Sequence, residues 1–74
     1  MRVAVIGMGH VGLPTAAVLA KLGHEVVATD NDEEKIALLV RGDIPFYEPD
    51  LKELVRSEIE RNRLEIVSDS NQFL

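Results

Sequence analysis

A short apolar run followed by three closely spaced glycines constrains the fold more than any other feature of this sequence. Residues 3–6 read Val-Ala-Val-Ile, and Gly7, Gly9 and Gly12 follow in the spacing G-x-G-x-x-G. Apolar residues at helical spacing begin directly after the last glycine. The short run predicts a buried strand, and the spaced pattern after it predicts a helix. We therefore expect a strand, a glycine turn and a helix at the N-terminus.

Each glycine has a physical role if this turn binds a dinucleotide. Gly7 permits the tight turn, Gly9 lets a pyrophosphate approach the backbone, and Gly12 lets the helix pack close to the strand. The free N–H groups at the helix N-terminus would then face the anion. The alternative is a structural turn without a ligand, because the glycine spacing alone is a weak signal. The flanking strand and helix, with an acid after the next apolar run, favour the nucleotide site.

Asp30 is that acid, and it stands 18 positions after Gly12. An acid at about this distance accepts hydrogen bonds from the adenosine ribose hydroxyls in dinucleotide sites. The alternative is a helix cap that follows the strand. The same carboxylate would repel a 2′-phosphate, and Asn31 rather than an arginine follows it. The sequence therefore favours NAD over NADP.

Other polar residues near the motif carry weaker signals. The spacing of Lys35 alone favours a solvated helix face, paired with Glu33 or Glu34, over a contact with the cofactor. His10 lies inside the glycine turn, so its side chain is expected near the cofactor but not at the reacting carbon. His24 is expected at the surface.

The rest of the chain predicts alternating strands and helices. We expect strands at 2–6, 25–29 and 64–68. We expect helices at 11–22, from Asn31 or Asp32 to before Gly42, and from Pro49 through Ile59. The first helix has one stripe that comprises Val11, Thr15, Val18, Leu19 and Leu22, and Gly23 is placed to end that helix. The second helix has Ile36, Leu39 and Val40 on its apolar face, and Asp69 or Ser70 resembles the cap of a further helix.

This alternation predicts parallel strands joined by right-handed crossovers. The expected fold is α/β, a partial Rossmann (doubly wound) unit with three parallel strands in the order 3-2-1 and flanking helices. We expect three layers. The segment Ile44–Pro49 is the least generic part of the chain, and we interpret it as a rigid loop packed under the sheet rather than a ligand contact. The arginines and glutamates between residues 53 and 63 are expected to form a solvated face.

Composition excludes several classes of function. The 74 residues form one domain at most, and they contain no cysteine and only two histidines, which argues against disulfides and metal sites. A formal net charge of −5 argues against nucleic acid and anionic membranes as partners. No segment is long and apolar enough for a signal peptide core or a membrane span. We therefore expect a soluble, cytoplasmic protein.

Four stretches of the sequence resemble the N-terminus of the UDP-glucose / GDP-mannose dehydrogenase family. They are residues 5–14 (VIGMGHVGLP), 22–26 (LGHEV), 30–35 (DNDEEK) and 42–51 (GDIPFYEPDL). The last stretch makes the resemblance specific, because most other Rossmann dehydrogenases lack an I-P-x-Y-E-P loop at this place. In two positions the sequence departs from the family: His10 replaces a usual Tyr, and Asp50 replaces a usual Gly, which leaves the subgroup and its sugar open.

The resemblance implies a function and a set of cofactor contacts. The family oxidises the C6 alcohol of a nucleotide sugar to a carboxylate with two NAD⁺ in succession. By position, Val11 is implied as a contact in the cofactor turn, Asp30 as the ribose acid and Lys35 as a second contact, which reverses the reading of Lys35 from spacing. The expected cofactor-binding residues are Gly7, Met8, Gly9, His10, Val11, Gly12, Asp30 and Lys35.

The resemblance also implies what these residues do not contain. The family's catalytic Cys, Lys, Asn and Asp lie further downstream, so we expect no catalytic residue here, and a nucleotide sugar would bind only to the full-length parent. Residues 1–74 are expected to be the incomplete N-terminal half of a dinucleotide-binding domain. A free edge of the first strand, at Val3 to Ile6, then favours self-association. The alternatives are a structural or nucleotide-binding fragment without catalysis, and part of another Rossmann oxidoreductase, such as an FAD-dependent oxidase or a hydroxyacid dehydrogenase.

Overall fold

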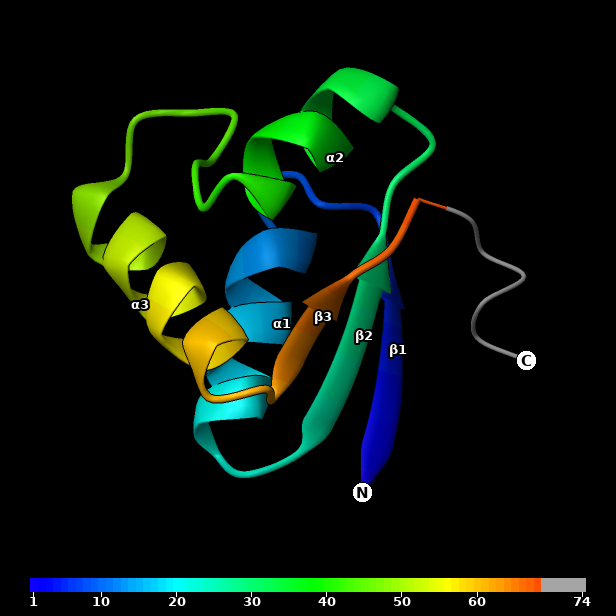
Figure 1. The fold of residues 1–74 in the computed structure, drawn as a ribbon, viewed down its shortest axis with the longest axis vertical. Helices are drawn as coiled ribbons and strands as arrows, with labels where there is room; N and C mark the ends of the chain where they lie inside the picture. The colour runs from blue at the N-terminus through cyan, green and yellow to red at the C-terminus, as the bar shows by residue number, and fades with distance from the viewer. Residues whose placement is uncertain (69–74) are drawn as a thin grey trace.

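Three parallel strands and three helices follow one another along the chain in the computed structural model, which describes residues 1–68 (Figure 1). The elements in chain order are β1 (Arg2–Ile6), α1 (Gly12–Lys21), β2 (Glu25–Thr29), α2 (Glu33–Val40), α3 (Pro49–Glu60) and β3 (Leu64–Ile66). The expected strands and helices are all present. Asp69 and Ser70, proposed as the cap of a further helix, lie outside the described residues.

The sheet has the order β1-β2-β3, so β2 is central, and the predicted order 3-2-1 is confirmed. Val3 of β1 stands beside Val26 of β2, and Val26 stands beside Leu64 of β3. The third strand is shorter than expected and ends at Ile66. The backbone N–H of Val67 still donates to the carbonyl oxygen of Ala28 at 2.9 Å. Among residues 1–68, β1 pairs with β2 alone and has one free edge.

All three helices lie on the same face of the sheet (Figure 1). One hydrophobic core joins them to the strands, and its buried members include Leu13 of α1, Leu39 of α2, Val55 of α3 and Val26 of β2. Both crossovers run in the same direction across the sheet, and right-handed connections then place their helices on one side. The expected three-layer arrangement is therefore wrong for residues 1–68, which form two layers.

The buried face of α1 differs from the predicted apolar stripe, although Leu19 of that stripe is partly buried and packs against the core. Leu13, Ala16, Ala17 and Ala20 are fully buried, whereas Val11, Val18 and Leu22 of the expected stripe are 79%, 49% and 70% exposed. Helical spacing fits both faces, because α1 is apolar almost all round. Small side chains allow a helix to come close to its neighbours, which explains why the alanine face packs inward. Gly23, with a φ of +103°, follows the C-terminus of the helix as predicted.

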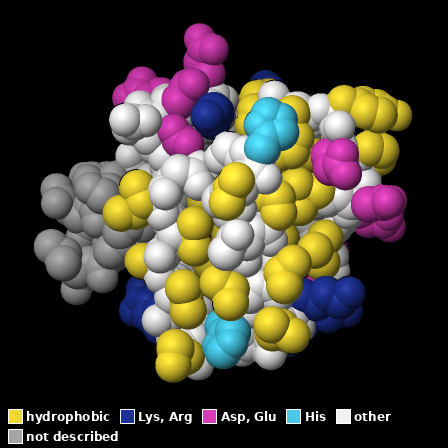
Figure 2. Space-filling view, turned by 180° about the vertical axis from the view of Figure 1, so that it is seen from behind, with side chains coloured by type: hydrophobic (Ala, Val, Ile, Leu, Met, Phe, Trp, Pro, Cys, Tyr) yellow, Lys and Arg dark blue, Asp and Glu magenta, His cyan; other side chains and the backbone are white. Residues whose placement is uncertain are grey.

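The outward face of α1 leaves large apolar side chains at the surface. Val11, Val18 and Leu22 are exposed there, and Ile6 at the end of β1 is 71% exposed. Figure 2 shows hydrophobic side chains gathered on the face opposite to the view of Figure 1. A surface of this kind is typical of an interface. Within residues 1–68, no helix is long and apolar enough to cross a membrane.

The ends of α2 follow their sequence signals, but its apolar face is narrower than expected. The carboxylate of Asp32 accepts a hydrogen bond from the N–H of Glu34 at 3.0 Å, so Asp32 rather than Asn31 is the N-cap. Ile36 and Leu39 are buried as predicted. Val40 is 64% exposed, so its assignment to the buried face is wrong.

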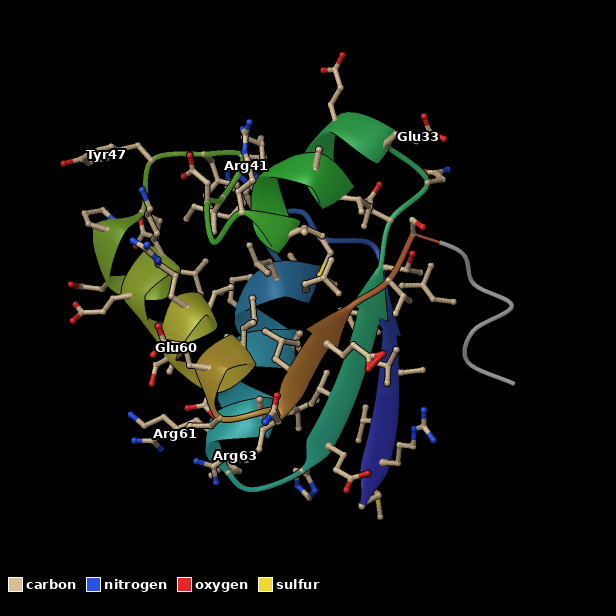
Figure 3. The ribbon with its side chains drawn as sticks, viewed as in Figure 1. Glu33, Arg41, Tyr47, Glu60, Arg61 and Arg63 are labelled. Carbon is tan, nitrogen blue, oxygen red and sulfur yellow. The ribbon has the colours of Figure 1, made fainter. Side chains whose placement is uncertain are left out.

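The expected solvated face of α3 contains a buried ion-paired residue. Glu58 is only 1% exposed, and its side chain lies 3.2 Å from Arg63 Nε and 3.8 Å from Arg61. Figure 3 shows both arginines at the C-terminal end of α3, where the chain turns into β3. The prediction of a solvated face is wrong for Glu58, whose pairing links the end of α3 to the start of β3.

Candidate dinucleotide site

The glycine turn and Asp30 come together at the carboxyl ends of neighbouring strands. The turn follows β1, Asp30 follows β2, and the N–H of Gly7 donates to the carbonyl oxygen of Thr29 at 2.8 Å. Ligands of open α/β sheets bind beyond the carboxyl ends of the strands. The turn then leads directly into α1, so the sequence motif, the helix N-terminus and the acid occupy one edge of the sheet.

The three glycines have three different reasons to lack a side chain. Gly7 has a φ of +100°, a conformation that other residues rarely adopt. A Cβ at Gly12 would overlap with the carbonyl oxygen of Gly7 and lie 2.9 Å from its carbonyl carbon. Gly9 has neither constraint, because its φ is ordinary and a Cβ there would meet no atom of the described residues 1–68 within 4 Å. Nothing in the described fold requires glycine at position 9, whereas a ligand that approaches the backbone would.

The N-terminus of α1 offers free hydrogen-bond donors. Its N-cap, Val11, makes no side-chain cap, and the first turn contains no acidic residue. The N–H of Leu13 donates to the carbonyl oxygen of Gly9 at 3.1 Å. Among residues 1–68 no acceptor is found for the N–H groups of His10, Val11 and Gly12. These donors and the helix dipole suit a phosphate group.

Asp30 is partly buried, and its side chain holds the turn in place. Its side chain is 7% exposed, and its Oδ2 accepts a hydrogen bond from the N–H of Met8 at 2.7 Å. Its Oδ1 accepts from the N–H of Asp32 at 2.8 Å. These two bonds, that of Met8 above all, and the nearby Lys35 cation lower the pKa of the Asp30 carboxyl, although burial opposes them. The carboxylate is therefore ionised near neutral pH, and each of its oxygens has lone-pair capacity left for a further donor.

The side chain of Lys35 on α2 lies beside Asp30. Its Nζ lies 3.8 Å from Asp30 Oδ2, and its side chain is 34% exposed. The expected pairing with Glu33 or Glu34 is not the one that the structure shows. A cation at this place can approach the ribose or phosphate oxygens of a bound nucleotide.

The structure gives the remaining predicted residues different positions around the turn. Met8 is fully buried in the core, and its N–H already donates to Asp30. Its side chain therefore anchors the turn to the core and is not exposed to a ligand. Val11 is exposed at the N-terminus of α1. The His10 ring is stacked on that of Phe46, with ring centroids 4.2 Å apart.

Phe46 is the neighbour of the turn that sequence reasoning missed. The segment Ile44–Pro49 stands out in the sequence, and the signal was its concentration of aromatic and proline residues. The predicted packing of this loop is confirmed for Ile44, which is 7% exposed and belongs to the hydrophobic core, and its rigidity stays a prediction. No rule of spacing connects residue 46 to residue 10, so their contact could be found only in the structure.

These observations fit the ADP half of a dinucleotide. The open space at Gly9 admits a pyrophosphate, the free N–H groups of α1 can bind it, and the Asp30 carboxylate can accept ribose hydroxyls. The sequence has no cysteine to serve as a redox group or thiol nucleophile. The arrangement can bind a cofactor, and the cofactor would supply the hydride chemistry.

Comparison with solved structures and curated relatives gives the same picture. UDP-glucose 6-dehydrogenase of Pseudomonas aeruginosa is 45% identical over 64 residues, which are 86% of this chain and 14% of that protein. The structure of UDP-D-ManNAc dehydrogenase from Pyrococcus horikoshii superposes with a TM-score of 0.93 at 30% identity, over 99% of this chain and 18% of that one. GDP-mannose dehydrogenase from Pseudomonas aeruginosa, solved as a ternary complex, gives a TM-score of 0.86 at 36% identity, over 93% and 16%.

The chain therefore spans less than a fifth of the length of each of these proteins. A family profile described as the NAD binding domain of the UDP-glucose/GDP-mannose dehydrogenase family matches residues 1–74. This match covers the glycine turn, Asp30 and Lys35 together. The protein belongs to the UDP-glucose/GDP-mannose dehydrogenase family, and the cofactor of the domain that it matches is NAD.

Proposed function

We propose that residues 1–74 bind the ADP half of NAD in a nucleotide-sugar 6-dehydrogenase. The observation that carries this proposal is the open backbone at Gly9 beside the uncapped N-terminus of α1. The N–H groups of His10, Val11 and Gly12 bind the pyrophosphate. This assignment uses the one glycine of the turn that the fold itself does not require.

Asp30 and Lys35 complete the proposed contacts. The ionised Asp30 carboxylate accepts a hydrogen bond from an adenosine ribose hydroxyl while it keeps its bond to Met8. Lys35 contributes a cation beside the same ribose. The buried negative charge of Asp30 disfavours a 2′-phosphate, so NAD⁺ binds in preference to NADP⁺.

The parent reaction is the oxidation of the C6 alcohol of a UDP- or GDP-sugar to a carboxylate. It removes two hydrides, which two NAD⁺ accept in succession, and water supplies the second carboxylate oxygen. The named relatives include UDP-glucose, UDP-D-ManNAc and GDP-mannose dehydrogenases, so the sugar stays open. The catalytic groups and the nucleotide-sugar site belong to the parent enzyme outside these residues. We also propose that residues 1–74 are the N-terminal half of its dinucleotide-binding domain, and a cytoplasmic location stays a prediction.

Calorimetric titration with NAD⁺ and its two halves tests the cofactor assignment. ADP-ribose should bind as NAD⁺ does, and nicotinamide mononucleotide should not bind, because the proposed contacts are all to the ADP half. Gly9→Val should abolish binding while the circular dichroism spectrum is retained, because its side chain fills the pyrophosphate space. Equal binding by the parent chain and Gly9→Val would refute the site. Absence of binding in a folded parent chain would favour the alternative of a structural fragment without cofactor affinity.

We further propose that the chain self-associates through the free edge of β1. The N–H of Glu25 donates to the carbonyl oxygen of Met1, and the N–H of Gly7 donates to that of Thr29. The backbone N–H and C=O groups of the odd-numbered residues along β1 therefore point toward β2. The alternation of a parallel ladder then turns the N–H and C=O groups of Ala4 and Ile6 outward. Light scattering should show dimers that Ala4→Pro, which removes an outward N–H, converts to monomers. A monomeric parent chain at high concentration would contradict this proposal.

A further inference from the structure

The segment between α2 and α3 is held by several contacts that its residues make before its aromatic side chains. Gly42 has a φ of +82°, and the N–H of Asp43 donates to the carbonyl oxygen of Leu38 at 2.9 Å. The Asp43 carboxylate accepts from the N–H of Ile44 at 2.9 Å and lies 3.3 Å from Lys52 Nζ on α3. These contacts, the Ile44 N–H first, lower the pKa of Asp43. The segment therefore has a defined path before it reaches Phe46.

Phe46 connects this ordered segment to the glycine turn. Its side chain packs against the hydrophobic core, and its ring stacks on that of His10 at a centroid distance of 4.2 Å and an interplanar angle of 21°. This distance is slightly shorter than the roughly 4.5–7 Å that is typical of attracting aromatic pairs, so the two rings are in close contact. His10 is otherwise at the surface of the turn. The stack is therefore a direct side-chain tie between the turn and the segment 43–48.

A turn that contains a conformationally free glycine needs a side-chain contact of this kind to stay ordered. His10 stands next to Gly9, which as a glycine has wide conformational freedom, and residues 1–68 offer no acceptor to the N–H of His10. Asp30 fixes the turn at Met8, and the N–H of Leu13 fixes it at the helix. Between these two points the carbonyl oxygen of Val11 accepts from Thr15 of the same helix, and the stacked His10 ring adds a contact with the segment between α2 and α3.

We propose that Phe46, acting through His10, is a positioning residue that holds the anion-binding turn in its binding conformation. The proposal rests on the proposed NAD site and deepens it, because it assigns a function to the segment Ile44–Pro49 outside that site. A turn that is already ordered loses less conformational freedom when it binds a ligand. Loss of the stack should therefore weaken NAD⁺ binding roughly two- to ten-fold, the range expected for one aromatic pair.

Hydrogen exchange in the free protein tests the tie without any ligand. Phe46→Ala should speed exchange of the Met8 and Leu13 amides, whose bonds flank the turn, and leave that of Val26 in the central strand unchanged. The matched control is Tyr47→Ala, because this neighbouring ring is 91% exposed and points away from the body of the molecule (Figure 3). Equal exchange at Met8 and Leu13 in Phe46→Ala and the parent chain would overturn the proposal.

A double-mutant cycle on NAD⁺ affinity tests the consequence for binding. Phe46→Ala and His10→Ala should each weaken binding, and the double variant should lose less than the product of the two factors. Phe46→Tyr, which keeps the ring, should bind as the parent does, and so should Tyr47→Ala. Independent effects of the two alanine variants would overturn the proposal. If the parent chain binds no NAD⁺, the proposed function fails, and the exchange measurement alone decides whether Phe46 holds the turn.

Discussion

Substitution of two glycines of the same turn by alanine should separate the demands of folding from those of binding. A Cβ at Gly12 overlaps with the backbone of Gly7, and a backbone atom cannot rotate aside as a flexible side chain can. A Cβ at Gly9 meets nothing within 4 Å, and its φ needs no glycine. We therefore expect Gly12→Ala to damage the fold and Gly9→Ala to damage only the cofactor site.

The size of the two effects follows from these contacts. Overpacking at a rigid contact costs about 1–3 kcal/mol of stability. The better helix propensity of alanine offsets little of this cost at the first residue of α1. A net loss of about 2 kcal/mol is a large part of the roughly 4–11 kcal/mol expected for a chain of this length. The melting temperature of Gly12→Ala should fall by about 10 °C. Gly9→Ala should keep the parent's unfolding free energy within about 0.5 kcal/mol.

Thermal and urea unfolding, followed by circular dichroism, measures the first half of this prediction. Titration of the folded Gly9→Ala variant with NAD⁺ measures the second half, and its affinity should fall at least about ten-fold because the methyl group occupies the pyrophosphate space. Equal stability of Gly12→Ala and Gly9→Ala would show that the close packing of α1 against Gly7 does not require glycine at position 12. Undiminished NAD⁺ affinity of Gly9→Ala would show that the pyrophosphate does not bind against the backbone of Gly9.

Three further predictions concern charged side chains. The folded-state pKa of Asp30 lies below its ordinary value of 3.8, so its contribution to stability is complete above about pH 4 and is lost as the pH falls through the folded-state pKa. In Asp30→Asn the unfolding free energy should therefore decrease less as the pH is lowered through this range, and urea unfolding at several pH values measures this. Glu58→Gln should lower the unfolding free energy by about 2 kcal/mol, because it leaves the partly buried Arg63 unpaired, and a matched Glu60→Gln exchange at an exposed site should not. Asp32→Ala should cost about 1 kcal/mol through loss of the α2 cap, and Asp32→Asn should restore most of it in the same unfolding assay.

The sequence predicted the order of elements and the residues of the turn because both depend on local chemistry. Gly7 and Gly23 have the positive φ angles that their positions require, and Pro49 is the first residue of α3. Asp30 and the turn could be placed side by side because both follow neighbouring parallel strands. These inferences use only spacing along the chain and general rules of parallel sheets.

The errors arose where a choice depends on tertiary packing. The helix α1 carries two apolar faces, and only the closeness of the sheet decides that Ala16 and Ala17 are buried while Val18 is exposed. Glu58 lies in a stretch of alternating charges, and its burial depends on Arg63 beyond the helix end. The contact of His10 with Phe46 joins residues far apart in the sequence.

We propose that the site for the ADP half of NAD is already formed within these 74 residues. Amide chemical shifts of the labelled chain, recorded during parallel titrations with NAD⁺ and NADP⁺, test it most directly. We expect shifts at residues 7–12 and at Asp30 and Lys35 with NAD⁺, and much weaker shifts with NADP⁺. A well-dispersed spectrum that NAD⁺ leaves unchanged would contradict it, because the fold would then be present without a working site.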